Sequence, residues 1–254
     1  MNSDTDRRRS GLKQYLINQH CNSGQTLLLR DEEFHYLCHV RRQKIQQSFN
    51  IKDCRGKCFK AVLSDIVESS CTLLIQDEVE KRAKTYEIEL YCCLPKGKKL
   101  DGIIRQATEA GVSRIIPLFS DHSLIHYQKE NDFDRKKVRW EKIIKEAQQQ
   151  SGSAMMTTLT NPLKVCNIPD VRENEKGYYC HQDYIRENSL RSLLQEDPWL
   201  IRIVIGPEGG LSNNEIQILE DKKFNPFYLG DNVLRTETAC LFAISSIITA
   251  MELL

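Results

Sequence analysis

The sequence lacks the glycine-rich loops that proteins most often use to hold phosphate groups. Neither G-x-x-x-x-G-K-[ST] nor G-x-G-x-x-G occurs anywhere in its 254 residues. This absence argues against a nucleotide-hydrolysing enzyme and against a nicotinamide-dependent one, because both hold their phosphates in such loops. A ligand held by other glycine loops is better predicted as an uncharged ring and ribose, contacted by peptide N–H and C=O groups.

The sequence also lacks the cysteine and histidine spacing of a metal site. Its 10 cysteines include no C-x-x-C pair, and Cys54-x-x-x-Cys58 is poorly spaced for zinc. His35 and His39 have the i, i+4 spacing of two ligands on a helix. However, no glutamate stands in the H-E-x-x-H position and no third ligand is in view. We therefore predict reduced thiols and no metal.

An excess of charge and a long apolar run are missing as well. The formal net charge is +1 and the pI is near 7.5, so any RNA contact has to come from a local patch. The longest uncharged apolar run, residues 238–251, is shorter than the roughly 20 residues that cross a membrane. The first residues are polar and have no apolar segment of the signal-peptide kind. We predict a cytoplasmic protein with no membrane partner.

Residues 13–80 are predicted to form a small β-rich domain, preceded by a disordered tail at residues 1–12. Turn material such as Gly56 separates short runs that are rich in β-branched and aromatic residues. One helix interrupts these runs, with Asp31 as its expected N-cap. The expected strands are residues 26–29, 49–52, 58–67 and 70–76.

From residue 85 onward the pattern changes to alternating strands and helices, which predicts an α/β domain over residues 85–254. Lys96, Lys98 and Lys99 stand where the first strand of this domain gives way to a helix. They can bind phosphates there, although a solvated loop explains their spacing equally well. We expect strands at residues 86–94, 113–119 and 178–181, and helices at residues 100–110 and over about 16 residues from near Asp134.

The domain closes with two units of strand, glycine loop and helix. In the first, residues 200–205 form a β-branched run that ends at Gly206-Pro207-Glu208-Gly209-Gly210. Ser212 and Glu215 then have the spacing of a capping box, which predicts that a helix begins there.

The second unit repeats this plan. Residues 227–229 are the expected strand, residues 230–235 the loop, and Thr236 the N-cap of an apolar helix that runs to residue 254. Parallel strands would place both loops side by side at one edge of the sheet, where open α/β proteins bind ligands. Ordinary turns are the competing interpretation.

These two loops resemble the signature of the RsmE family. The matching segments are I-G-P-E-G-G-L-S at residues 205–212, L-G at 229–230 and L-R-T-E-T-A at 234–239, with further matches at residues 35–42 and 96–123. The resemblance implies an α/β fold in which a C-terminal trefoil-knotted SPOUT methyltransferase domain follows a small PUA-like β-barrel that helps to hold RNA. It also implies a homodimer. The cofactor it implies is S-adenosyl-L-methionine, and the substrate is a uridine N3 in 16S ribosomal RNA of the small subunit.

The resemblance also suggests roles for individual residues. Arg235 is expected to stabilise the negative charge that a uridine gains on losing its N3 proton, and Glu237 or Glu208 to accept that proton. A structural Arg235–Glu237 ion pair is the competing interpretation. The expected cofactor contacts are Cys180, Ile205, Gly206, Gly209, Gly210, Leu211, Leu229, Gly230 and Leu234, with His181 as a neighbour. The expected phosphate contacts are Arg41, Arg42, Lys96, Lys98 and Lys99.

Three positions depart from the family pattern through the loss of a cation. Gln106, Ser153 and Asn232 stand where members of the family usually have lysine or arginine. These losses leave two alternatives open. One is a SPOUT methyltransferase that acts on transfer RNA or on another ribosomal RNA position. The other is a non-catalytic RNA-binding factor of ribosome assembly that keeps the cofactor pocket.

Overall fold

The computed structural model describes residues 14–80, 84–97, 99–123, 130–181 and 197–252. The chain separates into two compact units. The N-terminal unit combines residues before 84 with residues 148–154, and the C-terminal unit holds residues 84–147 and those from 155 onward. Within the described ranges, no helix is both long and apolar enough to cross a membrane. The predicted tail at residues 1–12 lies outside them.

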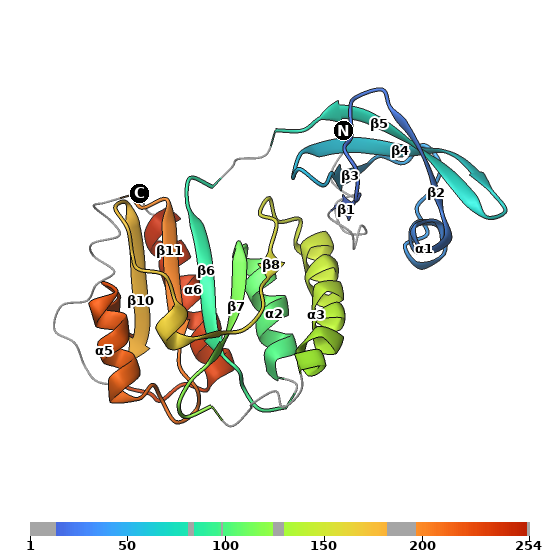
Figure 1. The fold of residues 1–254 in the computed structure, drawn as a ribbon. Helices are drawn as coiled ribbons and strands as arrows, with labels where there is room; N and C mark the ends of the chain where they lie inside the picture. The colour runs from blue at the N-terminus through green and yellow to red at the C-terminus, as the bar shows by residue number, and fades with distance from the viewer. Residues whose placement is uncertain (1–13, 81–83, 98, 124–129, 182–196, 253–254) are drawn as a thin grey trace. The chain divides into compact units, whose positions relative to one another are not determined.

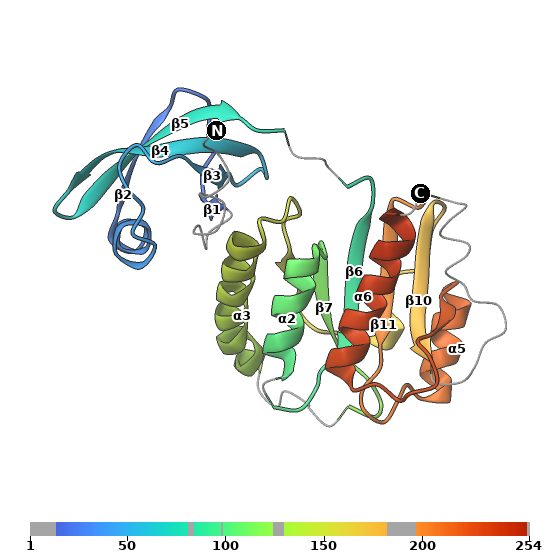
Figure 2. The same cartoon turned by 180° about the vertical axis from the view of Figure 1, so that it is seen from behind.

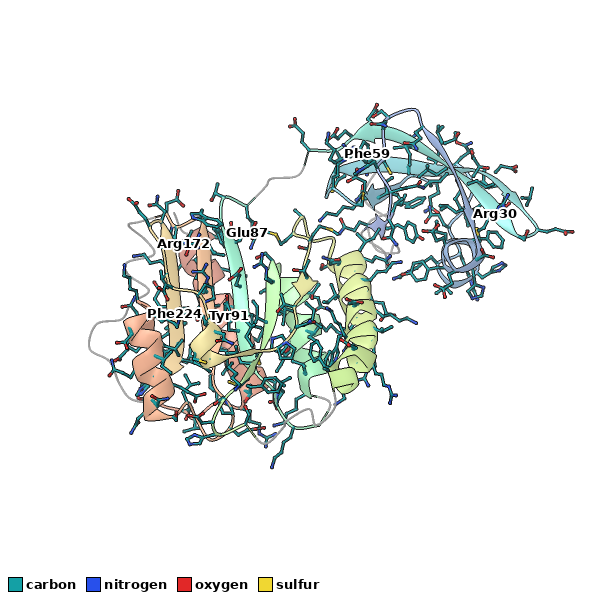
Figure 3. All side chains as sticks on the ribbon, viewed as in Figure 1. Arg30, Phe59, Glu87, Tyr91, Arg172 and Phe224 are labelled. Atoms are coloured by element: carbon teal, nitrogen blue, oxygen red, sulfur yellow. The ribbon has the colours of Figure 1, made fainter. Side chains whose placement is uncertain are left out.

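The N-terminal unit is built on a five-stranded sheet with the order β1–β3–β4–β5–β2 (Figure 1). Its strands are β1 Tyr15–Leu16, β2 Thr26–Arg30, β3 Phe49–Lys52, β4 Cys58–Val67 and β5 Ser70–Glu78. Neighbouring strands are antiparallel, except that β1 runs parallel to β3. Phe59, labelled in Figure 3, packs with Leu63 and Leu73 in the core of this unit. The four strands predicted here are confirmed.

The helix of this unit differs from its prediction. Helix α1, Asp31–Phe34, has only 4 residues and continues as the π-helix η2, His35–Val40. Arg30 holds the N-cap position and its side chain makes no capping hydrogen bond, so the prediction of Asp31 as N-cap is wrong. Asp31 has a φ of 47°, which means that the chain enters the helix through a left-handed turn rather than through a side-chain cap.

The C-terminal unit contains a seven-stranded sheet in which all paired strands are parallel. The order is β12–β10–β11–β6–β7–β8, and β9 also pairs with β7. The central strand β11, the predicted β-branched run, is buried along its whole length, as expected for a strand covered on both faces. The strands are β6 Glu87–Cys93, β7 Arg114–Phe119, β8 Thr158–Leu159, β9 Leu163–Lys164, β10 Glu175–His181, β11 Leu200–Ile205 and β12 Asn225–Tyr228.

Helices cover both faces of this sheet. Figures 1 and 2 show α2, Lys99–Ala110, α3, Glu130–Ser151, and α6, Thr236–Glu252, on one face and α5, Asn213–Asp221, on the other. The predicted helix at residues 100–110 is confirmed. Helix α3 begins before Asp134 and has 22 residues, so it is longer than predicted. Helix α6 begins at Thr236 itself, so Thr236 is its first residue rather than its N-cap.

Two apolar cores follow from the alternation of side chains along each strand. Leu90 of β6 packs with α2 and α6 in one core. Tyr91, the next residue, packs with Val204, Phe224 and Leu219 of α5 in the other, and Figure 3 labels both Tyr91 and Phe224. Successive strand residues point to opposite faces, so a single strand anchors both helix layers.

The strand order corrects one part of the sequence prediction. The two strands that lead into glycine loops, β11 and β12, are not neighbours, because β10 lies between them. All three strands are parallel, so their carboxyl ends still share one edge of the sheet. The two loops and the end of β10 therefore form three sides of one site.

Candidate active site

A cavity of about 280 Å³ opens at the carboxyl ends of β10, β11 and β12. Its volume is near the lower limit for small-molecule sites. The tertiary structure brings every residue predicted to contact a cofactor onto its wall, namely Cys180, Ile205, Gly206, Gly209, Gly210, Leu211, Leu229, Gly230 and Leu234, together with His181 and Glu208. Their role as cofactor contacts stays a prediction.

The first glycine loop needs glycine for two different reasons. A Cβ on Gly206 would lie 3.2 Å from the Leu211 side chain and 3.3 Å from the Leu211 backbone nitrogen. Gly210 has a φ of 75°, a left-handed conformation that side chains disfavour, and its N–H donates to the Pro207 carbonyl at 2.9 Å. The loop therefore folds tightly, and its glycines place no side chain between the backbone and the cavity.

A turn after β7 braces this loop. The buried carboxylate of Glu215 accepts hydrogen bonds from Ser120 Oγ at 2.9 Å, Asp121 N at 3.0 Å and Ser212 N at 2.9 Å. His122 Nδ1 lies 3.0 Å from the Gly210 carbonyl oxygen and donates to it. Glu215 thus completes the predicted capping box of α5, which is confirmed, and fixes the neighbouring turn at the same time.

Sequence reasoning missed this brace. The available signal was the polar run at residues 120–123 directly after a strand. A polar turn after a parallel strand lies at the same edge as the glycine loops, and that edge becomes clear only with the sheet order.

Replacing Glu215 with alanine should lower the free energy of unfolding by roughly 1–3 kcal/mol, because it leaves buried donors without an acceptor. It should also weaken binding at the cavity, since the turn that contacts Gly210 loses its anchor. Chemical unfolding and calorimetric titration with S-adenosylmethionine measure the two effects. Gln217→Ala is the matched control, because Gln217 lies on the exposed side of the same helix and, among the described residues, its side chain bonds Asp221 alone. Equal stability of the two variants would contradict the proposed brace.

Cys180 contributes an uncharged wall to the cavity. Burial raises the pKa of its thiol far above the ordinary value, so the side chain stays protonated at neutral pH and is not a nucleophile. Leu211, Leu229 and Leu234 complete the apolar part of the wall. This arrangement suits the flat face of an uncharged ring.

The two candidate proton acceptors meet at a lysine. Lys99 Nζ lies 2.9 Å from Glu208 Oε1 and 3.6 Å from Glu237 Oε2. Lys99 was predicted to contact RNA phosphate, and the structure instead places it between the two carboxylates. The alternative of an Arg235–Glu237 ion pair is wrong, since Glu237 faces Lys99.

Arg235 and Asn232 lie on the loop that precedes α6. Arg235 is exposed, and its guanidinium forms no ion pair with any carboxylate of the residues that the structure describes. Asn232 is exposed and lines the cavity. The predicted catalytic arginine lies between two lining residues, Leu234 and Thr236, but does not itself line the cavity, whereas the position of one missing cation, Asn232, does.

A family model described as RNA methyltransferase domain matches residues 81–248, and one described as RNA methyltransferase PUA domain matches residues 29–76. The Aquifex aeolicus (strain VF5) protein named ribosomal RNA small subunit methyltransferase E is 32% identical over 230 residues, covering 87% of this chain and 93% of that protein. The chain belongs to the RsmE family of RNA methyltransferases. The protein of the same name from Bacillus subtilis (strain 168) is 29% identical to this RsmE-family chain. The match spans 94% of this chain and 96% of the Bacillus subtilis protein.

Solved structures agree with the fold of this RsmE-family chain. A methyltransferase from Legionella pneumophila in complex with S-adenosylmethionine has a TM-score of 0.81 at 25% identity, covering 94% of this chain and 97% of that one. A ribosomal RNA small subunit methyltransferase E from Neisseria gonorrhoeae has a TM-score of 0.82 at 23% identity with the same coverage. The predicted α/β methyltransferase domain with its PUA-like partner is confirmed.

The predicted RNA contacts of this RsmE-family chain have different surroundings. Arg41 donates from Nε to the Tyr36 hydroxyl at 2.9 Å and lies over the Tyr36 ring, so its guanidinium is partly used within its own unit. Arg42 and Lys96 are exposed. Lys98 lies outside the described residues. Arg42 and Lys96 are therefore the predicted phosphate contacts whose side chains form no hydrogen bond or ion pair with the described residues, although the charge of Lys96 helps to lower the pKa of Glu208.

The cavity of this RsmE-family chain fits a ligand with an uncharged ring and a positive centre. Gly206, Gly209 and Gly210 line the cavity, and without side chains they let a ring approach the backbone closely. Glu208 and Asp231 also line the cavity, and such carboxylates attract a cation. Among the described residues, no group of three or more His, Cys, Asp or Glu side chains is arranged to hold a metal ion.

Proposed function

We propose that this chain transfers the methyl group of S-adenosylmethionine to N3 of a uridine in 16S ribosomal RNA of the small subunit. The observation that carries the proposal is the cavity at the ends of β10, β11 and β12, whose walls are the two glycine loops. A relative that matches most of this chain is named a ribosomal RNA small subunit methyltransferase. A similar structure was solved with S-adenosylmethionine.

The cofactor, when bound, supplies a methyl group that its positive sulfur already activates. The work of the protein is then alignment, exclusion of water and removal of the substrate proton. Backbone groups of the glycine loops would hold the adenosine, and the Glu208 and Asp231 carboxylates would attract the positive end. The residues that would make these contacts are Gly206, Gly209, Gly210 and Gly230 for the backbone and Leu211, Leu229 and Leu234 for the apolar walls.

The nucleophile requires two further groups. N3 of uridine carries a proton at neutral pH, and its loss places negative charge on the flanking carbonyl oxygens. The exposed Arg235 guanidinium would stabilise that charge, because it is not engaged by a neighbouring carboxylate. Glu237 or Glu208 would accept the proton. The target base has to leave its stack to reach the cavity.

The proposal includes a homodimer, a trefoil knot formed by the C-terminal segment, and a cytoplasmic location. Helix α6 exposes Leu241 and Phe242, and the loop before it exposes Val233. Exposed apolar side chains on this helix and on the loop before it support a protein interface there. Sedimentation equilibrium of the purified protein measures the mass, and a monomer over the micromolar range would remove the dimer from the proposal.

The missing cations motivate the principal alternative substrate. Asn232 borders the cavity and Gln106 is exposed on α2. At Ser153 the backbone oxygen accepts hydrogen bonds from Gln14 and Lys52. A weaker or altered RNA contact at Asn232 would move the target to transfer RNA or to another ribosomal position. Complete loss of turnover would leave a non-catalytic assembly factor.

The deciding experiment uses small ribosomal subunits from cells deleted for this gene. They are incubated with the purified protein and labelled S-adenosylmethionine, with transfer RNA in parallel, and the product nucleoside is identified by mass spectrometry. We expect N3-methyluridine in the subunit RNA. Label in transfer RNA alone would move the substrate and keep the chemistry. Cofactor binding without label in any RNA would support the assembly factor.

A further inference from the structure

Three charged side chains from distant parts of the chain meet around Lys99, and one of them, Glu208, lines the cavity. Lys99 is the first residue of α2, Glu208 lies in the glycine loop after β11, and Glu237 lies in the first turn of α6. Lys99 Nζ donates a hydrogen bond to Glu208 Oε1 at 2.9 Å across a separation of 109 residues. Together with the ion pair between Lys99 and Glu237, this hydrogen bond joins three elements that lie far apart in the sequence.

The two carboxylates differ in how Lys99 holds them. Glu208 accepts the hydrogen bond, whereas Glu237 Oε2 lies 3.6 Å from Lys99 Nζ, beyond hydrogen-bond reach. Glu237 Oε2 is also buried and has no hydrogen-bond partner among the described residues. A buried carboxylate oxygen without a donor is unfavourable, and a donor from a bound substrate would relieve that cost.

The charge states are consistent with this division. The hydrogen bond from Lys99 lowers the pKa of Glu208, and the same bond to Glu208, with the nearby charge of Glu237, raises the pKa of Lys99. Lys99 is therefore a cation and Glu208 an anion throughout the neutral range.

We propose that Lys99 is a positioning residue. It engages Glu208 in a hydrogen bond, so that Glu237 is the carboxylate that accepts the substrate proton. This inference rests on the proposed uridine-N3 reaction. The N3–H bond breaks and its proton goes to Glu237 Oε2, while the N3 electron pair forms the bond to the methyl carbon. The carbon–sulfur electron pair stays on sulfur, which becomes neutral. The charge of Lys99, 3.6 Å away, holds the Glu237 carboxylate in place, and Lys99 gains no proton itself.

The neighbouring Lys96 provides a matched comparison. It is exposed and forms no ion pair with the described residues, and it lies on the same segment between β6 and α2. A lysine that contacts phosphate contributes to RNA affinity and to its salt dependence, by about 0.7 to 0.9 in the slope of log affinity against log salt. A positioning lysine contributes to the rate instead.

The test compares Lys99→Met with Lys96→Met. The affinity of each variant for small ribosomal subunits from the deletion strain is measured over a range of salt concentrations. The rate of single-turnover methyl transfer is measured at saturating concentrations of the subunits and of S-adenosylmethionine. We expect K99M to keep the affinity and salt slope of the wild type and to lose about 100-fold or more in rate. We expect K96M to weaken binding and to flatten the salt slope. K99M behaving as K96M would overturn the inference.

Two further variants separate the roles of the carboxylates. At saturating S-adenosylmethionine, Glu237→Gln should lose about 100-fold or more in single-turnover rate. Glu208→Gln, which removes a carboxylate that attracts the cofactor, should lose much less in that rate and should chiefly weaken cofactor binding. A larger loss in E208Q than in E237Q would overturn the assignment even if K99M fails to fold.

Failure of the inference is distinguishable from failure of the proposed function. If the wild-type protein methylates no uridine N3, the proposed function fails, and the salt-dependent binding of K99M and K96M still decides whether Lys99 contacts phosphate. If the wild type is active and K99M retains its rate, only the role of Lys99 is overturned.

Discussion

Arg202→Leu should destabilise the C-terminal unit by about 3–5 kcal/mol, because it removes the buried cation that two buried carboxylates share. Arg202 lies on the central strand β11 with only 7% of its side chain exposed. Its Nε donates to Glu89 Oε2 at 3.1 Å and its Nη1 donates to Glu175 Oε2 at 2.6 Å. Glu89 and Glu175 are 6% and 4% exposed, so water cannot replace the lost partner.

Arg114→Ala is the matched control for this prediction. Arg114 pairs with the other oxygen of the same Glu89 carboxylate at 2.9 Å, but 51% of its side chain is exposed. An exposed ion pair contributes about 1 kcal/mol or less. The free energies of unfolding of the two variants, measured in urea, should therefore differ by several kcal/mol, although both variants remove one arginine from Glu89. A loss below about 1 kcal/mol for Arg202→Leu would show that the buried network is not needed for stability.

Gly210→Val should reduce affinity for S-adenosylmethionine by about 100-fold, or roughly 2.7 kcal/mol. Gly210 has a φ of 75°, and a β-branched residue is a steric outlier in that region. The backbone has to rotate away to accept valine, which breaks the Gly210 N–Pro207 O hydrogen bond and the contact with His122. The wall of the cavity then moves. Calorimetric titration measures the affinity.

Gly24→Val separates local strain from loss of the site. Gly24 has a φ of 81° and, like Gly210, nothing within 4 Å of an added Cβ, but it lies in the N-terminal unit. The Gly24→Val variant should lose about as much stability through backbone strain as Gly210→Val does, and should keep the wild-type affinity for the cofactor. An equal loss of affinity in both variants would mean that the glycine loop does not form the cofactor site.

Local patterns in the sequence were sufficient for most of the secondary structure. The β-branched run of β11, the capping box at Ser212 and Glu215, and the glycine loop at Gly206 all act within a few residues of themselves, so they can be identified without the fold. The predictions that were wrong concern helix ends, at Asp31 and Thr236. There the preference of one residue competes with the path that the packed chain has to follow.

The sequence by itself determined most of the strands, the capping box of α5 and the glycine loops, because these depend on neighbouring residues. The residues that line the cavity were predicted from the resemblance to a family. The tertiary structure alone decided that β10 separates β11 from β12, that Lys99 meets Glu208 and Glu237, and that His122 holds Gly210. These contacts join residues far apart in the chain through the order of a parallel sheet. That order follows from how the helices cover the two faces, and no local pattern encodes it.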